Sequence, residues 1–352
     1  MRTVTLKEVL DGPVEFGPCI HTHVVDLYAG VGGFSTGAEL AGHSVKIAIE
    51  GWADALAWHH KNHPETDHYR YWLPDNRLLE RLPPPRTKWH LHGSPPCTLL
   101  SKVHNTEDHR SRWDEGLENV KYYIELARTT EPASWSMEQV NNKVVIQLLN
   151  EYVKLYPEFI DYEVIKMEQY GVPQMRKRLI AGSPWLIQRL RDIRGSMPRK
   201  RARDGCSTIP EEAIGIKGQR QNKSGDVRSR TPAFQTVNMK IAMDRRMQHG
   251  GLSSPAPTVL CSNALMWAKV GGHTIRCLNV REHADYQTFP SDYKFPDNCC
   301  LAQTLVGNSV PPAFAKVLMD NYRLPMDRHQ FPDPDFPSRP PSPCAHTHTP
   351  TH

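Results

Sequence analysis

Residues 26–37 read DLYAGVGGFSTG, and this stretch decides the fold. Gly30, Gly32 and Gly33 follow an apolar segment and precede a helix-like one, so the pattern predicts a buried strand that turns sharply into a helix. At such a turn the backbone approaches a ligand closely and the first helical amides point at it. The spacing is GxGGxxxG rather than the dinucleotide pattern GxGxxG, and alone it is equally typical of a plain tight turn.

Short apolar runs that end in glycine or an acidic residue alternate with helical patterns along the first half of the chain. Alternating strands and helices predict an α/β fold with a parallel sheet covered on both faces. Ligands of such sheets bind at the carboxyl ends of the strands. The expected strands span 23–30, 44–50, 88–95, 133–140, 162–171 and 177–184, and the expected helices include 34–42, 52–62, 116–129 and 142–155.

An acidic residue ends the second expected strand. Glu50 stands twenty residues after Gly30, where a carboxylate accepts hydrogen bonds from ribose hydroxyls. With the glycine turn it predicts an adenosine-containing cofactor, and at this point both a dinucleotide and S-adenosylmethionine remain open.

A cysteine follows two prolines at the exit of the strand expected at 88–95, in the stretch HGSPPCTLLS. Proline fixes φ and removes a backbone donor, so Pro95 and Pro96 stiffen this exit and aim Cys97. A thiolate is a strong nucleophile, which makes Cys97 a candidate for covalent catalysis. The alternative is that Cys97 is a small buried hydrophobic residue, the usual place of a free cysteine.

Further polar residues end the neighbouring strands. Glu138 ends the run ASWSMEQV and is a candidate proton donor in the same crevice, although glutamate at a strand end is more often only solvated. Gln174, Arg176 and Arg178 alternate, so in an extended segment they share one face. Alternating arginines usually form a solvated strand face, but beside a crevice they clamp a carbonyl or a phosphate.

The composition bounds the class of protein. The chain has 352 residues, 39% of them hydrophobic, which is enough for a large and a smaller domain with packed cores. Its eight cysteines form no CxxC pair, so neither a zinc site nor a disulfide scaffold is expected. The N-terminal segment lacks a signal-peptide apolar stretch, and no run of 18 apolar residues occurs. We therefore expect a soluble intracellular protein without a membrane or metal partner, in the nucleus or the cytoplasm.

Basic charge is concentrated in residues 186–250, which hold 15 Lys/Arg against 6 Asp/Glu, whereas the whole chain has a net charge of +5. A solvated loop would explain any single one of these residues. Their concentration beside the expected crevice favours a surface that contacts nucleic-acid phosphates. The proline- and histidine-rich residues 325–352 predict a disordered tail.

In order along the chain, these motifs resemble those of the DNA cytosine-5 methyltransferase family. The resemblance covers about residues 23–320 except 186–250, where the family has its variable target-recognition domain. It implies a Rossmann-like S-adenosylmethionine-dependent methyltransferase sheet with a second, smaller target-recognition domain. The matching segments are DLYAGVGGFSTG, GSPPC with a downstream serine, EQV, QMRKR, PAPTVL leading to IRCLNVREHADYQTFP, and LVGNSVPPAFAKVL.

The resemblance implies a cofactor site for S-adenosylmethionine. Tyr28 is expected against the adenine, Glu50 on the ribose hydroxyls and Asp75 near the adenine amino group. Trp52 stands one position beyond the place where the family often has a stacking aromatic residue. The remaining expected contacts are Asp26, Gly30, Gly32, Gly33, Asn308, Ser309 and Val310.

The resemblance also implies a catalytic cycle on cytosine in double-stranded DNA. Cys97 attacks carbon 6, Glu138 binds or protonates nitrogen 3, Arg178 holds the exocyclic oxygen and Arg176 orients this group. The base has to be flipped out of the duplex, and residues 102–116, with Arg110 and Arg112, are the expected closing loop. A plain surface loop would have a similar sequence.

Two positions depart from the family pattern. Thr98 stands where the family usually has glutamine, and Gln139 stands where it usually has asparagine, one methylene shorter. That asparagine braces the cysteine loop, so a shift of about 1 Å at this position is expected to cost roughly 100-fold in rate. Because the nucleophile, the acid and the arginines are all present, we expect an active enzyme.

Three other readings compete with this one. The substrate could be RNA, as in one branch of the family, but the CFT-type segment of that branch is absent. The chain could instead be a catalytically silent partner of an active methyltransferase, although it keeps the cysteine and the glycines that such relatives lose. A nicotinamide-dependent dehydrogenase conflicts with the glycine spacing and leaves Cys97, Glu138 and the GNSVPP segment without a role.

The expected organisation is a monomer with two lobes and DNA bound between them. Its target sequence, and its role in restriction-modification, in a virus or in epigenetic maintenance, stay open. The expected divisions are an N-terminal extension at 1–19, a catalytic lobe at 20–185, a small recognition lobe at 186–275, a returning part at 276–324 and the tail at 325–352.

Overall fold

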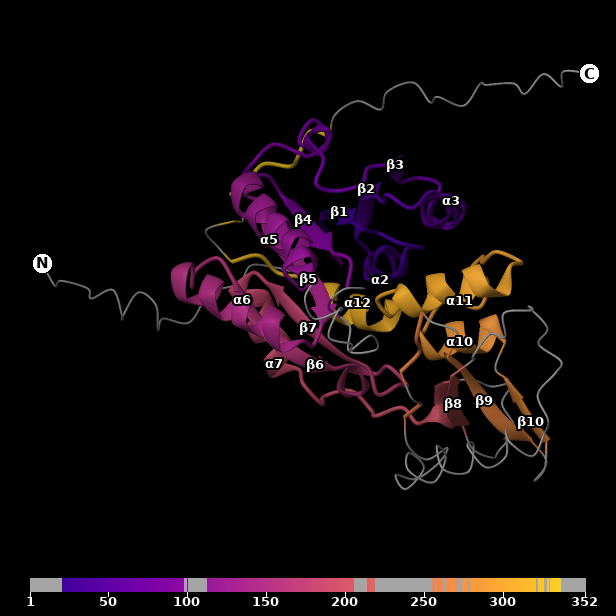
Figure 1. Ribbon diagram of the computed structural model, residues 1–352. Helices are drawn as coiled ribbons and strands as arrows, with labels where there is room; N and C mark the ends of the chain where they lie inside the picture. The colour runs from indigo at the N-terminus through magenta and orange to yellow at the C-terminus, as the bar shows by residue number, and fades with distance from the viewer. Residues whose placement is uncertain are drawn as a thin grey trace, which may run out of the picture.

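The chain forms a seven-stranded sheet flanked by helices and a separate three-stranded sheet (Figure 1). The structure is a computed structural model. It describes residues 21–97, 100, 113–205, 214–218, 255–256, 258–261, 264–270, 274–277, 279–320, 322–325, 328 and 330–336.

The large sheet has the strand order β3-β2-β1-β4-β5-β7-β6. The first five of these strands in that order run parallel, and β7 is antiparallel to both of its neighbours. The all-parallel sheet expected from the sequence is therefore wrong at this edge. The strands are β1 His23–Leu27, β2 Ser44–Ile49, β3 Asp67–Tyr69, β4 Trp89–Gly93, β5 Ser134–Val140, β6 Asp161–Lys166 and β7 Lys177–Gly182.

Two apolar layers cover the sheet. One contains buried side chains of α5 and α6, among them Tyr123 and Leu149, and the other contains side chains of α2, α7 and α12, among them Phe34, Leu190 and Phe314. The helices are α2 Gly33–Leu40, α3 Ala53–Asn62, α5 Trp113–Thr130, α6 Lys143–Leu155, α7 Pro184–Asp192 and α12 Pro312–Met319, with short 3₁₀ helices at η1 Asn76–Leu78 and η4 Met167–Tyr170.

The last helix returns to the first one. α12 packs on α2 so closely that a Cβ atom at Gly37 would lie 2.4 Å from the Cβ of Ala315 and 2.4 Å from the carbonyl oxygen of Pro312. A side chain at position 37 would force the two helices apart. The C-terminal part of the chain therefore completes the lobe that the N-terminal part begins.

A third apolar cluster joins the loop after β1 to the elements that follow the small sheet. It includes Val31, Tyr286 and Leu305. The small antiparallel sheet has the order β10-β9-β8 and lies to one side of the large one (Figure 1). The elements of the small sheet and of the segments before and after it are α8 Ala202–Gly205, β8 Ile214–Gly218, β9 Ala264–Val270, β10 Thr274–Cys277, α10 Val280–Tyr286 and α11 Cys299–Asn308.

Two segments lie differently from the expected divisions. Leu186, Ile187 and Leu190 of α7 are buried against the large sheet, so the catalytic lobe extends past residue 185. Residues 328 and 330–336, expected in a disordered tail, include contacts to the amino ends of the strands. Arg328 donates to the carbonyl of Ala133 (2.7 Å), and the Phe336 ring packs edge-on against His23.

Candidate functional site

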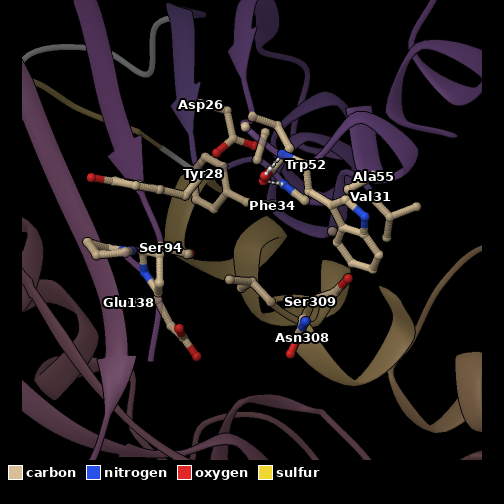
Figure 2. Close-up of a pocket in the computed structure, with 18 of the residues that line it drawn as sticks. Asp26, Tyr28, Val31, Phe34, Trp52, Ala55, Ser94, Glu138, Asn308 and Ser309 are labelled. Carbon is tan, nitrogen blue, oxygen red and sulfur yellow. Dashed lines mark hydrogen bonds between the residues drawn. The ribbon is translucent and has the colours of Figure 1, made fainter. Parts of the chain in front are cut away.

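A cavity of about 470 Å³ opens at the carboxyl ends of β1, β2, β4 and β5. Figure 2 shows Asp26, Tyr28 and Trp52 on one side of it, with Asn308 and Ser309 across from them. The expected site residues that line it are Asp26, Tyr28, Gly30, Gly33, Glu50, Cys97, Glu138, Asn308, Ser309 and Val310. Of the others, Gly32, Asp75, Arg176 and Arg178 lie outside this lining.

The turn between β1 and α2 forms the floor of the cavity and needs its glycines. Gly30 and Gly32 have φ values of 57° and 102°, in the left-handed region that side chains disfavour. At Gly33, a Cβ atom would lie 2.2 Å from the carbonyl oxygen of Val310. At Gly30, no atom lies within 4 Å of a Cβ position, so the cavity is open above this residue. The turn is therefore shaped to admit a ligand against its backbone.

Gly32 serves the fold beneath the turn. A Cβ atom there would lie 2.6 Å from Nε2 of His63 and 2.7 Å from the hydroxyl oxygen of Tyr293. Its left-handed backbone also forms the N-cap of α2. Gly32 is thus required for the shape of the turn, although it does not line the cavity.

Two carboxylates give the cavity its charge. Glu50 accepts hydrogen bonds from the backbone amides of Gly30 (2.9 Å) and Trp52 (2.8 Å), which ties the ends of β1 and β2 together. Burial raises the pKa of Glu50, and the amide hydrogen bonds lower it. Burial raises the pKa of Asp26 to about 7, although its carboxylate accepts a hydrogen bond from the hydroxyl of Ser35. The cavity is suited to a cationic ligand.

Asp75 does not share this cavity. Its side chain accepts from the backbone amide of Arg77 (2.9 Å) at the start of η1 and pairs with the Arg77 guanidinium. The pairing lowers the pKa of Asp75. Trp72 and Tyr71 line the cavity instead, and Trp72 is 69% exposed.

The family motifs did not predict Trp72 as a cavity residue, but the sequence contains a signal for it at Gly51. Gly51 directly follows Glu50, and a Cβ atom at Gly51 would lie 2.5 Å from the indole ring of Trp72. The missing side chain at position 51 makes room for an aromatic ring from 21 residues further along the chain. Trp52, weighed from the sequence as a stacking residue, also lines the cavity.

Two side chains fix the cysteine loop, one near the end of β5 and one just after it. The Gln139 amide donates to the carbonyl of Pro95 (3.0 Å), and its oxygen accepts from the amide of Val140 (2.7 Å). Asn142 donates to the carbonyl of Leu100 (2.6 Å). The longer side chain at position 139 therefore reaches the loop that the family's asparagine braces.

The Cys97 thiol belongs to a residue that lines the cavity. Burial raises its pKa, the positive charge of Arg178 lowers it, and the Glu138 carboxylate raises it further. The free protein therefore holds Cys97 as a thiol at neutral pH. Activation requires a change that accompanies the substrate.

Glu138 lies between two arginines. Its Oε1 is 2.8 Å from Nε of Arg178, in an ion pair without a linear hydrogen bond, and 4.0 Å from Nη2 of Arg176. The direction of β7 explains this: the antiparallel strand begins where β5 ends, with Arg178 paired opposite Val140. An arginine at the start of a strand thus reaches the carboxyl edge of the parallel sheet.

Arg176 connects the site to distant parts of the chain. Its guanidinium is buried and donates to the carbonyls of Val259 (3.2 Å), Gly307 (3.3 Å) and Ser309 (3.2 Å). Burial lowers the pKa of Arg176 to about 9. Gln174 is also buried and donates to the carbonyl of Tyr286 (2.8 Å). The alternating polar residues therefore hold segments together rather than forming a solvated face.

Part of the expected basic surface is neutralised within the protein. Arg191 pairs with Asp161 (2.5 Å) and Glu163 (2.9 Å), and Arg194 pairs with Glu163 (2.7 Å). These two arginines bind the sheet edge and do not offer a free charge to a phosphate. Most of residues 206–254, together with Thr98 and the loop arginines Arg110 and Arg112, lies outside the described residues.

Among the described residues, no helix is both long and apolar enough to span a membrane. In the same part of the chain, no group of three or more His, Cys, Asp or Glu side chains is arranged to hold a metal ion.

The chain is similar to type II methyltransferases along most of its length. It is 24% identical over 342 residues to M1.HphI of Haemophilus parahaemolyticus, an alignment that covers 86% of this chain and 87% of the relative. It is 25% identical over 330 residues to M.MthTI of Methanothermobacter thermautotrophicus, covering 84% and 95%.

Solved structures show the same fold at lower identity. A protein of an E. coli prophage, described as a DNA modification methyltransferase, has a TM-score of 0.55 at 20% identity and covers 85% of this chain and 98% of its own. The Dnmt2 methyltransferase of S. pombe has a TM-score of 0.52 at 14% identity, with coverage of 85% and 97%.

A family model described as C-5 cytosine-specific DNA methylase matches residues 22–183 and 187–323. This match includes the glycine turn, the cysteine loop, Glu138, both arginines and the returning helices. On this match over most of its length, the chain belongs to the C-5 cytosine-specific DNA methylase family, whose members are methyltransferases.

Proposed function

We propose that this protein transfers a methyl group from S-adenosylmethionine to carbon 5 of cytosine in DNA, with Cys97 as the covalent nucleophile. One observation carries the proposal: Cys97 and Glu138 line the same cavity as the glycine turn and Glu50. The proposed nucleophile for the base and the proposed binding residues for the methyl donor therefore line one cavity.

The cavity fits the methyl donor by its chemistry. S-adenosylmethionine supplies, when bound, a methyl group on a positively charged sulfur. Asp26 and Glu50 are the carboxylates that would face its charges and ribose, and the open space above Gly30 would admit it against the backbone. Tyr28, Trp52 and Trp72 are the aromatic rings that would contact the adenine.

The protein's own side chains then act on the cytosine. The Cys97 thiol gives its proton to water as the base enters, and the thiolate attacks carbon 6. The electrons of the carbon 5–carbon 6 double bond move toward carbon 5, which becomes nucleophilic. Glu138 donates a hydrogen bond or a proton to ring nitrogen 3 and stabilises the developing charge. Arg178 holds the exocyclic oxygen, and Arg176 keeps Glu138 and the returning segments in place. After methylation, loss of the carbon 5 proton restores the ring and expels Cys97.

A cytosine in a duplex cannot reach Cys97 without leaving the base stack. Flipping costs about a few kcal/mol, which contacts to phosphates and to the base pocket offset. We propose that the DNA lies between the lobe built on the large sheet and the small lobe that contains β8–β10, and that one chain acts as a monomer. Gel filtration with and without a duplex would test the last point.

Removing the brace at Gln139 should slow the reaction. Gln139→Leu keeps the volume but loses the donor to Pro95, so the cysteine loop shifts and the rate falls by about 10- to 100-fold. Gln139→Asn, which restores the family's residue, should stay within a few-fold of wild type. Single-turnover methylation rates measure both. Equal rates for Gln139→Leu and wild type would exclude the bracing role.

The proposed reaction is tested by covalent trapping. A duplex with 5-fluorocytosine has no carbon 5 proton to lose, so the enzyme should stay attached to it in the presence of S-adenosylmethionine. The adduct, seen as a shifted band in a denaturing gel, should be absent with Cys97→Ser. Sequencing the trapped DNA would give the target.

The same assay separates the alternatives. An adduct on fluorinated RNA and none on DNA would assign an RNA substrate. No adduct on either nucleic acid, while calorimetry shows S-adenosylmethionine binding, would make this chain a silent member of the family.

A further inference from the structure

A continuous line of hydrogen bonds leads from the protein surface to Asp26 in the cavity. It begins at His60, an exposed residue of α3, passes through His68 of β3 and returns to His59 of α3. From His59 it crosses to Ser35 of α2 and ends at Asp26. Ser35 and His59 are fully buried, and Asp26 is 1% exposed.

The four contacts are short enough for protons to be shared. His60 Nδ1 lies 3.2 Å from His68 Nδ1, and His68 Nε2 lies 2.8 Å from His59 Nδ1. His59 Nε2 is 3.0 Å from the Ser35 hydroxyl, which donates to Asp26 across 2.7 Å. Two imidazole nitrogens at 2.8 Å require a hydrogen between them, and no metal-binding group occurs among the described residues.

The chain of contacts fixes which nitrogen carries each hydrogen when Asp26 is ionised. Because Ser35 donates to Asp26, His59 must donate to Ser35 from Nε2. The bare Nδ1 of His59 then accepts from Nε2 of His68, and Nδ1 of His68 accepts from Nδ1 of His60. Burial holds the pKa of His59 well below its ordinary value, so this ring is neutral throughout.

The same contacts can carry a proton from the protein surface to Asp26. If His60 takes a proton from solvent on Nε2, it passes its Nδ1 hydrogen to His68. His68 passes its own Nε2 hydrogen to His59, which passes its Nε2 hydrogen to Ser35, and Ser35 protonates Asp26. One proton enters from water and one arrives at the carboxylate. The transfer itself adds no net hydrogen to any of the three rings.

Other charged and titratable groups face this line. Glu50 and Tyr123 lie near Asp26, and Tyr293 is also within its electrostatic reach. His63 lies beside His59 with ring centroids 4.5 Å apart, but it contacts Glu39, Thr36 and Tyr293. His63 therefore has its own partners and forms a branch outside the line.

We propose that His60, His68, His59 and Ser35 form a proton relay that loads and unloads Asp26 from the protein surface, so that cofactor binding is coupled to proton release. The coupling to the cofactor rests on the proposed function. The relay reaches Asp26 from the side of α2 and α3, so it stays open to solvent when a ligand fills the cavity.

The direction of the coupling follows from charge. Burial raises the pKa of Asp26 to about 7, so the free protein holds this proton at lower pH. A cationic ligand favours the carboxylate and expels the proton. Affinity for such a ligand should therefore rise with pH, up to about tenfold per unit below pH 7, and become constant above it.

The relay can be tested in the free protein by NMR. In the ¹⁵N-histidine-labelled full chain, long-range proton–nitrogen spectra report which ring nitrogen carries the hydrogen. At pH 8.5, His59 and His68 should carry it on Nε2 and His60 on Nδ1. On lowering the pH, all three should reverse with one shared midpoint near the pKa of Asp26, about 7.

Two variants and a matched control decide the result. Asp26→Asn should abolish the reversal, and Ser35→Ala should uncouple the three histidines from Asp26. Thr36→Val removes the neighbouring hydroxyl of α2, which contacts His63 instead, and should leave the reversal unchanged. If either core variant unfolds, His60→Gln at the exposed end should still prevent the reversal of His68 and His59. Separate midpoints, or a reversal that persists in Ser35→Ala, would overturn the relay.

Calorimetry then tests the coupling to the cofactor. Titration of S-adenosylmethionine at pH 7 in two buffers of different ionisation enthalpy should show about half a proton released by wild type and none by Asp26→Asn. Equal proton release by both proteins would overturn the coupling. A failure of the wild type to bind S-adenosylmethionine would count against the proposed function, while the NMR result would still decide the relay.

Discussion

Cys97→Ala is expected to lower the methylation rate by at least about 10⁴-fold, because without a thiolate carbon 5 of cytosine stays too weak a nucleophile. The binding of S-adenosylmethionine should be nearly unchanged, since Cys97 is not among the residues proposed to hold the cofactor. The measurements are single-turnover transfer of labelled methyl groups to duplex DNA and calorimetric titration of the cofactor.

A second cysteine provides the control for this prediction. Cys299 is exposed at the start of α11 and does not line the cavity, so Cys299→Ala should methylate DNA at the wild-type rate. If Cys97→Ala kept its rate within tenfold of wild type, methyl transfer would not proceed through a cysteine adduct.

Arg176→Met is expected to destabilise the folded protein by roughly 3–5 kcal/mol, because it leaves three carbonyls without their charged donor and removes one of the two arginines beside a buried carboxylate. The carbonyls belong to Val259, Gly307 and Ser309, and the carboxylate to Glu138. Urea unfolding followed by tryptophan fluorescence measures the loss. The cofactor should also bind more weakly, since Ser309 lines the cavity.

An exposed arginine is the matched comparison. Arg86 pairs with Glu131 at the surface, where its side chain is 72% exposed. Arg86→Met should therefore leave the midpoint of urea unfolding nearly unchanged. Similar losses for the two variants would mean that Arg176 does not hold the distant segments together.

The sequence predicted the structure best where a backbone conformation requires one particular residue type. Gly30, Gly32 and Gly33 predicted the turn between β1 and α2, and their φ values and close contacts explain why. Short apolar runs predicted β1 and β2. Each of these features depends on neighbours along the chain, which a sequence pattern records directly.

Local sequence patterns could not predict the direction of a strand or the contacts between residues far apart in the chain. The buried run at 177–182 has the same apolar character whichever way it runs, so β7 could be predicted as a strand but not as an antiparallel one. Arg176 resembles a solvated residue because its partners lie 83 to 133 residues later. Asp75 was assigned by motif order, and in the structure it pairs with Arg77 and is not among the residues that line the cavity.

The contact of Gly33 with Val310 has a consequence for how this protein is made. The floor of the cavity comes from the start of the chain and one wall from residues synthesised more than 270 positions later. A chain released early from the ribosome has the glycine turn but no wall to close over a ligand, so a ligand of the cavity cannot stabilise a truncated product. If the chain were cut into two fragments, one with Gly33 and the other with Val310, the cavity would assemble only when the fragments associate. Methylation activity would then report their association.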